Sequence, residues 1–339
     1  MAKATIKDVA KYANVSIGTV SHVINHEGSV KEATKQKVMD AISALGYIPN
    51  ASARSLRSEK SNVIGLVVSD ISNIHFTYMA KVIEDALQKE DFSLVICSTD
   101  DDPAQELRHL QRLREMRVDG IIINTTGGND AYIVQLSHIL PIVLIERKIC
   151  NPRLRGDLVT SNNYDGVYTM TQLLIDSGHK RIGIINADLQ VSTGKERFAG
   201  FQAAMSGVGI SVDENYRYRY DCHIFRMESG MAGCKALMSL TPPPTAIVVT
   251  NNTLAIGVYK YLRQSNFSVP DDVSVLSYGN IANDDLFYVR PGYTTLNPAF
   301  IGEKAASCLL SRIKNSETQN REIIFEPLLI RNNSVKEID

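Results

Sequence analysis

The sequence predicts a small all-α helix-turn-helix head followed by a two-lobed α/β core built on doubly wound parallel sheets. Three observations lead to this fold class. The first sixty residues show helical periodicity with short breaks. After Ser61, apolar runs alternate with helix-like stretches, which is typical of doubly wound sheets. About 280 residues are more than one such sheet normally uses, so two lobes are expected.

The head is expected to contain three helices. Thr5 and Asp8 resemble a capping box at the start of the first helix. Ser16 is placed to cap the second helix, and the third is expected over Glu32–Leu45, ended by Gly46. The residues expected to face inward are Ile6, Val9, Ala10, Ala13, Val20, Val23, Ile24, Val38, Ala41, Ile42 and Leu45.

The outward face of the second predicted helix carries small polar and apolar side chains. A helix N-terminus with such side chains can approach phosphates and base edges in the major groove of DNA. A generic three-helix bundle has the same periodicity, so both interpretations stay open on the pattern alone. The outward residues are Ile17, Gly18, Ser21, His22 and Asn25.

The charge of the chain is distributed unevenly. Its formal net charge is -1, from 36 lysines and arginines and 37 acids. Residues 1–60 contain nine of the basic residues and five of the acids. A basic head on an acidic body is typical of nucleic-acid-binding heads, although a solvated surface can reach this balance by chance.

The segment after the head is expected to form a short hinge helix. Pro49 ends the preceding element, and Asn50 can cap a new helix. In a dimer, small residues would let two such helices approach, arginines would hold phosphates, and Leu56 would wedge between base steps. An ordinary linker helix is the alternative. The small residues of this segment are Ala51 and Ala53, and its arginines are Arg54 and Arg57.

The body alternates predicted strands with predicted helices. The strands are Val63–Val68, Leu94–Cys97, Gly120–Ile123, Ile142–Ile145, Ile182–Ile185, Ala246–Val249 and Val273–Leu276. The helices are Tyr78–Lys89, Ala104–Arg114, Tyr168–Ser177, Glu196–Ser206, Leu254–Arg263 and Gly302–Ile313. Ligand sites in such folds lie beyond the carboxyl ends of the strands, so the segments that follow them are the candidates for a site.

Several function classes lose support from the sequence. No phosphate-binding glycine loop follows a strand, and no catalytic constellation or paired carboxylates stand out. The five cysteines lie far apart, so neither zinc nor another cofactor is expected. The absence of an apolar leader and of a long apolar run predicts a cytoplasmic protein without membrane contact. His75, His138 and His179 are interpreted as surface or internally bonded residues.

Specific motifs give a family resemblance. Ile6-Lys7-Asp8-Val9-Ala10, Val15-Ser16 with Thr19-Val20-Ser21-His22-Val23-Ile24-Asn25, and Gly46-Tyr47 with Pro49-Asn50 and Ala53-Arg54-Ser55-Leu56 resemble the lactose/galactose repressor (LacI/GalR) family, most closely its purine and ribose repressor branch. The body continues the resemblance at Arg117–Ile121, Ser177–Ile182, Arg197–Phe201, Val269–Val275 and Thr294–Leu296. Lys31 departs from the family, which usually caps the third helix with a small hydroxyl residue.

The resemblance implies a domain organisation. Residues 1–46 would be the DNA-binding domain, 47–60 the hinge or linker, and 61–339 a periplasmic-binding-protein-like core for effector binding and dimerisation. The N-lobe would hold about 62–160 and 293–322, and the C-lobe about 163–290 and 323–339. The N-lobe would form much of the dimer interface.

The resemblance also implies a repressor rather than an enzyme. Its partners would be a pseudo-palindromic operator, a second copy of the chain (a tetramer stays open) and a small sugar-like effector. A small-molecule carrier or a sugar-processing enzyme is the alternative, against which the head and the missing catalytic groups count. Effector binding would close the lobes, with induction and co-repression both open. The expected DNA contacts are Thr5, Ser16, Ile17, Gly18, Thr19, Ser21, His22, Asn25, Tyr47, Asn50, Ala53, Arg54 and Leu56.

The effector site follows from the same resemblance. Arg197 opens the family's Arg-x-x-Gly-Phe helix, where an arginine binds hydroxyls or a carboxylate; a surface ion pair is the alternative. The expected effector contacts are Asp70, Phe76, Asn124, Glu146, Asn162, Arg197, Asn252 and Asn280.

Three acidic positions of the family are neutral here. Asn252 replaces the usual sugar-binding aspartate, and the segments that contain Asn162 and Asn280 also lack the family's acids. Losing acids while keeping Arg197 predicts a sugar acid or sugar phosphate as effector. Because Asp70, Asp100 and Glu146 could restore negative charge, a neutral sugar is an equal alternative.

Overall fold

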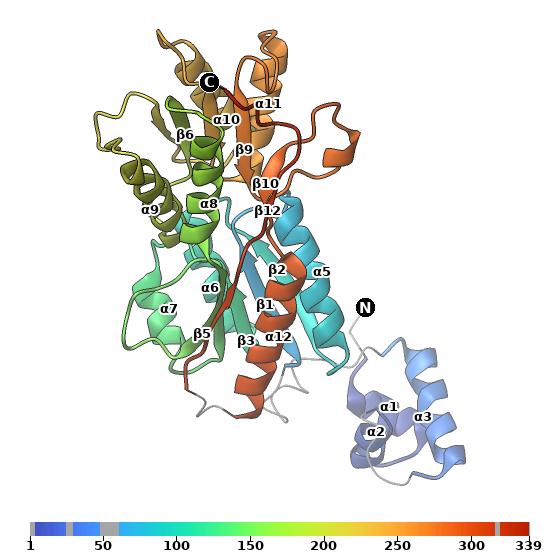
Figure 1. The fold of residues 1–339 in the computed structure, drawn as a ribbon. Coiled ribbons are helices and arrows are strands. Elements are labelled where there is room, and N and C mark those ends of the chain that lie inside the picture. The colour runs from blue at the N-terminus through green and yellow to red at the C-terminus, as the bar shows by residue number, and fades with distance from the viewer. Residues whose placement is uncertain (1–3, 25–29, 48–60, 316–318, 339) are drawn as a thin grey trace. The chain divides into compact units, whose positions relative to one another are not determined.

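The computed structural model describes residues 4–24, 30–47, 61–315 and 319–338 (Figure 1). It divides into two compact units, Met1–Ser61 and Asn62–Asp339, which have separate hydrophobic cores. The division falls beside residue 60, where the sequence pattern changes. Among the described residues, no helix has both the length and the apolar composition that crossing a bilayer requires.

The first unit consists of α1 (Ile6–Ala13), α2 (Ile17–Ile24) and α3 (Glu32–Leu45). The three helices expected from the sequence are therefore confirmed, and α1 packs against both of the others. The buried residues of this core are Val9, Ala10, Ala13, Val20, Val23, Val38 and Ala41. A core this small leaves the head dependent on well-capped helix ends.

Side chains satisfy two of the three helix starts in the head. The Asp8 carboxylate accepts hydrogen bonds from the Thr5 amide at 2.8 Å and the Thr5 hydroxyl at 2.7 Å, which completes the expected capping box. Ser16 Oγ accepts from the Thr19 amide at 3.0 Å. Gly46, at a φ of 56°, ends α3 in the left-handed region, where glycine is favoured.

The third helix start lacks such a bond, because Lys31 makes no capping hydrogen bond. We expect Lys31→Ser to stabilise α3 by about 0.5–1 kcal/mol, since a hydroxyl can accept from a first-turn amide. Amide hydrogen exchange on the full chain should show protection of α3 rising roughly two- to fivefold. Lys37→Ser, at an exposed position inside the helix, should lower protection slightly; an equal gain in both variants would contradict the capping argument.

The second unit contains a six-stranded sheet in each lobe. The N-lobe sheet has the order β11-β5-β4-β3-β1-β2, with every pair parallel. Its strands are β1 (Val63–Val68), β2 (Ser93–Ser98), β3 (Gly120–Ile123), β4 (Ile142–Ile145), β5 (Gly156–Ser161) and β11 (Glu322–Phe325). One face is covered by α5 (Ile74–Gln88) and α12 (Pro298–Lys314), and the other by α6 (Pro103–Glu115) and α7 (Asp130–Leu136).

The C-lobe sheet has the order β12-β10-β9-β8-β6-β7, and only the β10–β12 pair is antiparallel among these described strands. Its strands are β6 (Ile182–Asn186), β7 (Arg219–Asp221), β8 (Ala246–Val249), β9 (Ser274–Tyr278), β10 (Gly292–Thr294) and β12 (Leu329–Ile330). One face packs on α8 (Asn163–Asp176) and α9 (Ser192–Gly207), the other on α10 (Met227–Met238) and α11 (Asn252–Gln264). A 3-10 turn, η1, spans Asp284–Leu286.

The lobes exchange chain at three crossings. The first follows Ser161, the last residue of β5. The second follows Thr294, later than expected, because β10 pairs with β9 of the C-lobe. The third follows Phe325 rather than residue 322, because β11 pairs with β5 of the N-lobe. Strand pairing therefore moves both later boundaries by a few residues.

His179 is a buried polar contact of the C-lobe. Its Nδ1 lies 2.9 Å from Thr245 Oγ1, and its Nε2 lies 3.0 Å from the Lys336 carbonyl oxygen. The interpretation of His179 as an internally bonded residue is confirmed. Burial lowers the pKa of His179 because the charged imidazolium loses its hydration, and the bond to Lys336 opposes this only in part.

This lowered pKa predicts a pH dependence of stability. Below about pH 6.5 the unfolded chain protonates this histidine while the folded chain does not, so stability should fall as the pH decreases from 7.5 to 5.5. Urea unfolding should show a smaller fall for His179→Gln than for the wild type. The same substitution at exposed His138 should leave the wild-type dependence unchanged; if it has the same effect, His179 is not responsible.

Candidate functional site

The exposed face of α2 presents the residues expected to face base edges. Ile17, Gly18 and His22 are all exposed, with 43% of the Ile17 surface accessible. The first turn of α2 contains no acidic residue. The positive end of the helix dipole is therefore not neutralised from within its own first turn, which suits an approach to phosphate.

The other expected DNA contacts have mixed placements. Ser16 and Thr19 hydroxyls lie 2.8 Å apart and brace the start of α2, so they are held in position. Ser21 is half-buried, Thr5 is exposed, and Tyr47 packs against the core of the head. The remaining expected contacts lie outside the described residues: Asn25, Asn50, Ala53, Arg54 and Leu56.

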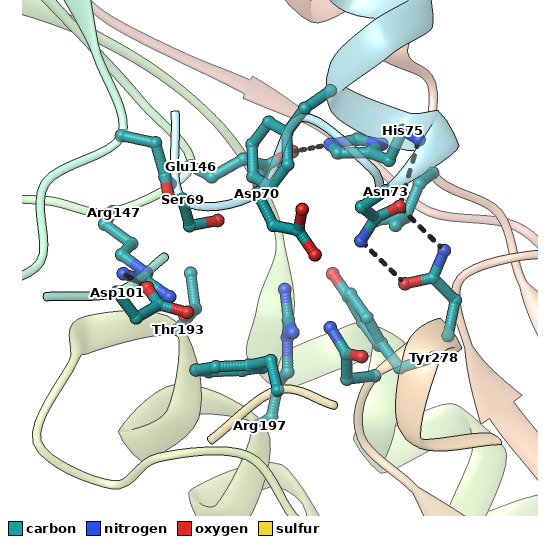
Figure 2. Close-up of a pocket in the computed structure, with 16 residues that line it drawn as sticks. Ser69, Asp70, Asn73, His75, Asp101, Glu146, Arg147, Thr193, Arg197 and Tyr278 are labelled. Atoms are coloured by element: carbon teal, nitrogen blue, oxygen red, sulfur yellow. Dashed lines mark hydrogen bonds and ion pairs between the residues drawn. The ribbon is translucent and has the colours of Figure 1, made fainter. Parts of the chain in front are cut away.

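A cavity lies between the two lobes of the core, beyond the carboxyl ends of β1, β3, β4 and β9 (Figure 2). Its volume is about 60 Å³, well below the roughly 300 Å³ that ligand pockets usually reach, so the lobes stand close together. Six expected effector contacts line it, namely Asp70, Phe76, Asn124, Glu146, Arg197 and Asn252. The other lining residues are Ser69, Asn73, His75, Asp101, Arg147, Thr193, Phe225, Asn251, Tyr278 and Leu296.

Glu146 is a buried carboxylate in the wall of this cavity. Its backbone has a φ of 58°, an unfavourable conformation for a residue with a side chain. Neither carboxylate oxygen accepts a hydrogen bond of regular geometry, and His75 Nε2 lies 3.4 Å from Oε1. Burial raises the pKa of Glu146, but contact with His75 and the charge of Arg197 outweigh it, so the pKa is lowered. An ionised acceptor therefore faces the cavity.

Arg197 reaches the cavity from α9 and is only 7% exposed. Its Nε donates to Asn163 Oδ1 at 2.8 Å, and its Nη1 donates to the Thr250 carbonyl at 3.0 Å. The guanidinium carbon lies 4.0 Å from the centre of the Tyr278 ring. These contacts fix the orientation of the guanidinium, and its burial contradicts the alternative of a surface ion pair.

Two more buried oxygens line the cavity without a hydrogen-bond partner, Asn124 Oδ1 and the Tyr278 hydroxyl. Burial and the nearby Glu146 charge raise the pKa of Tyr278, while Arg197 opposes this, so the hydroxyl keeps its proton. Unpaired buried polar groups are costly. These oxygens and Glu146 together make a surface suited to a ligand that offers hydrogen-bond donors.

The charges of the cavity are close to balanced. Asp70, Asp101 and Glu146 are acidic, whereas Arg147 and Arg197 are basic. Asp101 Oδ1 lies 2.7 Å from Arg147 Nη1, so this pair neutralises itself. Asp100 lines a neighbouring hollow instead. Two of the three acids that could restore negative charge, Asp70 and Glu146, therefore line the cavity, and the loss of acids at other positions does not leave the cavity positive.

Asn162 and Asn280 do not line the cavity. Asn162 caps α8, where its Oδ1 accepts from the Asp165 amide at 3.2 Å, and its Nδ2 donates to Glu326 Oε2 at 2.9 Å. Asn280 is exposed beyond the end of β9. These placements do not support the expectation that the two side chains contact the effector. The Asn162 side chain instead bonds to Asp165 and Glu326, beside two crossings between the lobes.

Most of the other cavity residues lie in the segments at strand ends that the fold class makes candidates for a site, although the sequence did not single them out as individual contacts. Asn73 and His75 follow β1, Arg147 follows β4, and Tyr278 ends β9. His75 is 8% exposed and pairs with Glu146. It is internally bonded, which is one of the two expected roles, but the sequence did not predict that it lines the cavity. Phe225 follows β7, a short half-exposed strand that carries no clear periodicity.

No group of three or more His, Cys, Asp or Glu side chains is arranged to hold a metal ion in the described part of the chain. All five cysteines are free; Cys150 is exposed and Cys97 is half-buried, while Cys222, Cys234 and Cys308 are buried.

Comparison with known proteins identifies both parts of the chain. Residues 5–50 match the family described as bacterial regulatory proteins, lacI family. Residues 61–333 match the family described as periplasmic binding proteins and sugar binding domain of LacI family. The HTH-type transcriptional repressor PurR of Mannheimia succiniciproducens is 35% identical over 339 residues, which cover 99% of each chain.

Solved structures share the fold. The lac repressor dimer bound to operator and the anti-inducer ONPF superposes with a TM-score of 0.82 at 21% identity, over 99% of this chain and 100% of that one. A LacI family regulator from Enterococcus faecium with bound ribose gives a TM-score of 0.71 at 23% identity, over 82% of this chain and 100% of that one. With the family matches and the PurR relative, these findings show that the chain belongs to the lacI family of bacterial regulatory proteins and is a DNA-binding transcriptional regulator rather than an enzyme.

Proposed function

We propose that this regulator is a repressor that binds a neutral, polyhydroxylated effector, such as an aldose, in the cavity between its lobes. The observation that carries the proposal is the ionised, buried Glu146, whose carboxylate oxygens face the cavity without regular hydrogen bonds. A buried carboxylate gains most from a ligand that donates hydrogen bonds to it.

The other groups of the cavity suit the same ligand class. Asn124 Oδ1 and the Tyr278 hydroxyl can accept from ligand hydroxyls, while the Arg197 guanidinium can donate to ligand oxygens. Phe76 and Phe225 offer apolar surface to the C–H faces of a ring. The ribose in the Enterococcus faecium structure supports a sugar here.

An anionic effector is the alternative, and the charge balance counts against it. An added carboxylate or phosphate would enter a cavity that already holds Asp70 and Glu146. Arg197 alone would face that charge, because Arg147 is paired with Asp101. Bringing a like charge close in a partly dry site is costly.

A thermal-shift panel of aldoses, the matching sugar acids and the matching sugar phosphates tests the effector class. A saturating neutral sugar should raise Tm by roughly 5–10 °C, because a ligand at 100 times its Kd stabilises by about 2.7 kcal/mol. Glu146→Gln should reduce this shift. A shift produced by sugar acids or phosphates and by no neutral sugar would overturn the proposal.

We also propose that two copies of the chain bind one pseudo-palindromic operator. The solved structure of a lac repressor dimer bound to operator supports binding as a dimer. Ile17, Gly18 and His22 would face base edges, while Ser16, Thr19, Ser21 and Asn25 would hold phosphates. Such a protein works in the cytoplasm, where the bacterial chromosome lies. Selection of bound duplexes from a random pool, followed by gel shift, should yield a palindromic site.

Leu56 provides a separate test of the hinge. Leu56→Ala should weaken operator affinity by roughly tenfold or more, since a wedge supports a kink that costs a few kcal/mol to form. Non-specific binding and its salt dependence should stay unchanged, because phosphate contacts supply both. Fluorescence anisotropy on operator and random duplexes measures the two affinities, and equal losses would exclude the wedge.

A further inference from the structure

Two helix starts from different lobes meet at the cavity. Asn73 caps α5 of the N-lobe, and Asn252 is the first residue of α11 in the C-lobe. Figure 2 shows hydrogen bonds that leave Asn73 toward the opposite lobe. The two side chains therefore connect the lobes directly, from positions 179 residues apart in the chain.

The two amides pair in both directions. Asn73 Nδ2 donates to Asn252 Oδ1 at 3.3 Å, and Asn252 Nδ2 donates to Asn73 Oδ1 at 3.3 Å. Asn73 Nδ2 also lies 3.4 Å from Thr253 Oγ1, and Asn73 Oδ1 accepts from the His75 amide at 3.0 Å. All four polar side-chain atoms of the pair are thus engaged within the protein rather than directed at a ligand.

Asn252 has no other bonding role at this helix start. Asn251 caps α11, because its Oδ1 accepts from the Thr253 amide at 2.8 Å and the Leu254 amide at 3.2 Å. Asn252 is only 5% exposed, and its side-chain hydrogen bonds lead to the other lobe. Helix capping therefore does not explain why residue 252 is an asparagine.

Reciprocal pairing explains why both residues are amides. Each group must donate and accept at once, which a carboxylate cannot do. An aspartate at 252 would place an oxygen against Asn73 Oδ1 and add charge to a cavity that contains Asp70. The positive ends of two helices would favour a carboxylate, so helix electrostatics does not account for the amide.

Other contacts that cross the cleft involve different residues. The Lys148 amide donates to Ser192 Oγ at 2.9 Å, and the Lys148 ammonium pairs with Glu196. The Arg147 guanidinium lies 5.2 Å from the centre of the Phe225 ring. The Asn73–Asn252 pair is therefore a link between the lobes that shares no residue with these contacts. Together the contacts hold the lobes around a cavity of only about 60 Å³.

We propose that the Asn73–Asn252 pair is a latch that holds the lobes closed through the protein's own side chains, and that Asn252 serves this contact rather than effector recognition. Widening the cleft breaks both hydrogen bonds, so the strength of the latch sets how easily the lobes separate. The latch goes beyond the proposed function, because it operates without effector and without DNA. It replaces the expectation that the effector closes the lobes: the lobes are already closed around a cavity of about 60 Å³, so an aldose would enter only when the latch opens.

Pulsed EPR on the full chain, with neither sugar nor DNA added, tests the latch. Nitroxides are attached at Gln135→Cys on α7 and Ser206→Cys on α9, both exposed, after Cys97→Ala and Cys150→Ser remove the accessible thiols. Labelled chain is diluted with unlabelled chain, so that distances within one chain are measured. With the latch intact, a single narrow distance distribution is expected.

Three variants weaken the latch but leave a residue at each position that is compatible with the start of its helix. Asn73→Ser retains a cap for α5 but is too short to reach the other lobe. Asn252→Asp removes one donor, and Asn73→Asp with Asn252→Asp places two carboxylates together. Each should add a second distance, and the double variant should raise the ratio of open to closed lobes roughly tenfold or more, since two hydrogen bonds are replaced by repulsion.

Asn215→Asp, at an exposed position in the C-lobe, is the matched control and should keep the wild-type distribution. Circular dichroism establishes that each variant is folded. A broad distribution in the otherwise wild-type chain, or a folded double variant with the wild-type distribution, would overturn the latch. These outcomes do not depend on whether the effector is neutral or anionic.

Discussion

Arg197→Met is expected to lower the affinity for the effector at least 100-fold. The substitution removes a buried guanidinium that Asn163 and the Thr250 carbonyl hold in place and that lies on the Tyr278 ring. A charged hydrogen bond to a ligand is worth about 1.5–3 kcal/mol, and 100-fold in affinity corresponds to about 2.7 kcal/mol. The substitution also removes a positive charge that lowers the pKa of Glu146. Without that charge, the Glu146 carboxylate is less readily ionised and is a weaker acceptor for the ligand.

Calorimetric titration with the sugar that gives the largest thermal shift measures this effect. Arg197→Lys should recover little affinity, because an ammonium does not reproduce the planar fork. Arg263→Met, at an exposed position on α11, should bind like the wild type. Operator affinity without effector should stay near the wild-type value in every variant. Undiminished sugar binding by Arg197→Met would exclude the cavity as the effector site.

Asp157→Ala is expected to lower the free energy of unfolding by about 3–5 kcal/mol, because it removes the carboxylate partner of the buried Arg312 guanidinium. The Arg321 side chain is 39% exposed, so its share of the loss should be small. Asp157 lies on β5 with none of its surface exposed. Its Oδ1 lies 2.6 Å from Arg312 Nη2, and its Oδ2 lies 2.7 Å from Arg321 Nη2. The Arg321 amide also donates to Oδ1 at 2.8 Å. One carboxylate thus joins β5 to α12 and to the start of β11.

Urea unfolding followed by fluorescence or circular dichroism measures the loss. Asp157→Asn should lose less, because an amide oxygen can still accept from Arg321. Burial raises the pKa of Asp157, but the bonds from Arg312 and Arg321 outweigh it, so the pKa is lowered. The contribution of Asp157 should therefore persist above about pH 4 and disappear as the pH falls further. Equal stability of Asp157→Ala and the wild type would show that the arginines find other partners.

The sequence predicts those parts of the fold that depend on local patterns. Buried strands such as β1 and β8 are continuous apolar runs, so periodicity finds them. The strands β7, β10 and β12 have two or three residues each, and pairing with a distant neighbour rather than local pattern makes them strands. The helix α10 contains Gly230 and Gly233, which weaken its helical signal.

The cavity was predictable in outline because strand ends carry its residues. Family resemblance places Arg197, and the chemistry of carboxylates near strand ends places Asp70 and Glu146. The pairing of His75 with Glu146 could not be predicted, because it joins the start of α5 to the end of β4 across the sheet. The partner of Asn252 is hidden for the same reason, since contacts between distant segments leave no periodic trace.

The three crossings between the lobes affect how the chain can fold during synthesis. The N-lobe sheet is completed by β11, and one of its faces is covered by α12, although most of the lobe precedes Ser161. A nascent chain that has emerged from the ribosome as far as the C-lobe therefore still exposes the apolar surface that α12 will bury. The first lobe can cover this surface only after α12 has been translated, and it can complete its sheet only after β11 has followed. Premature termination or a frameshift before Glu322 therefore leaves both lobes without their final strands.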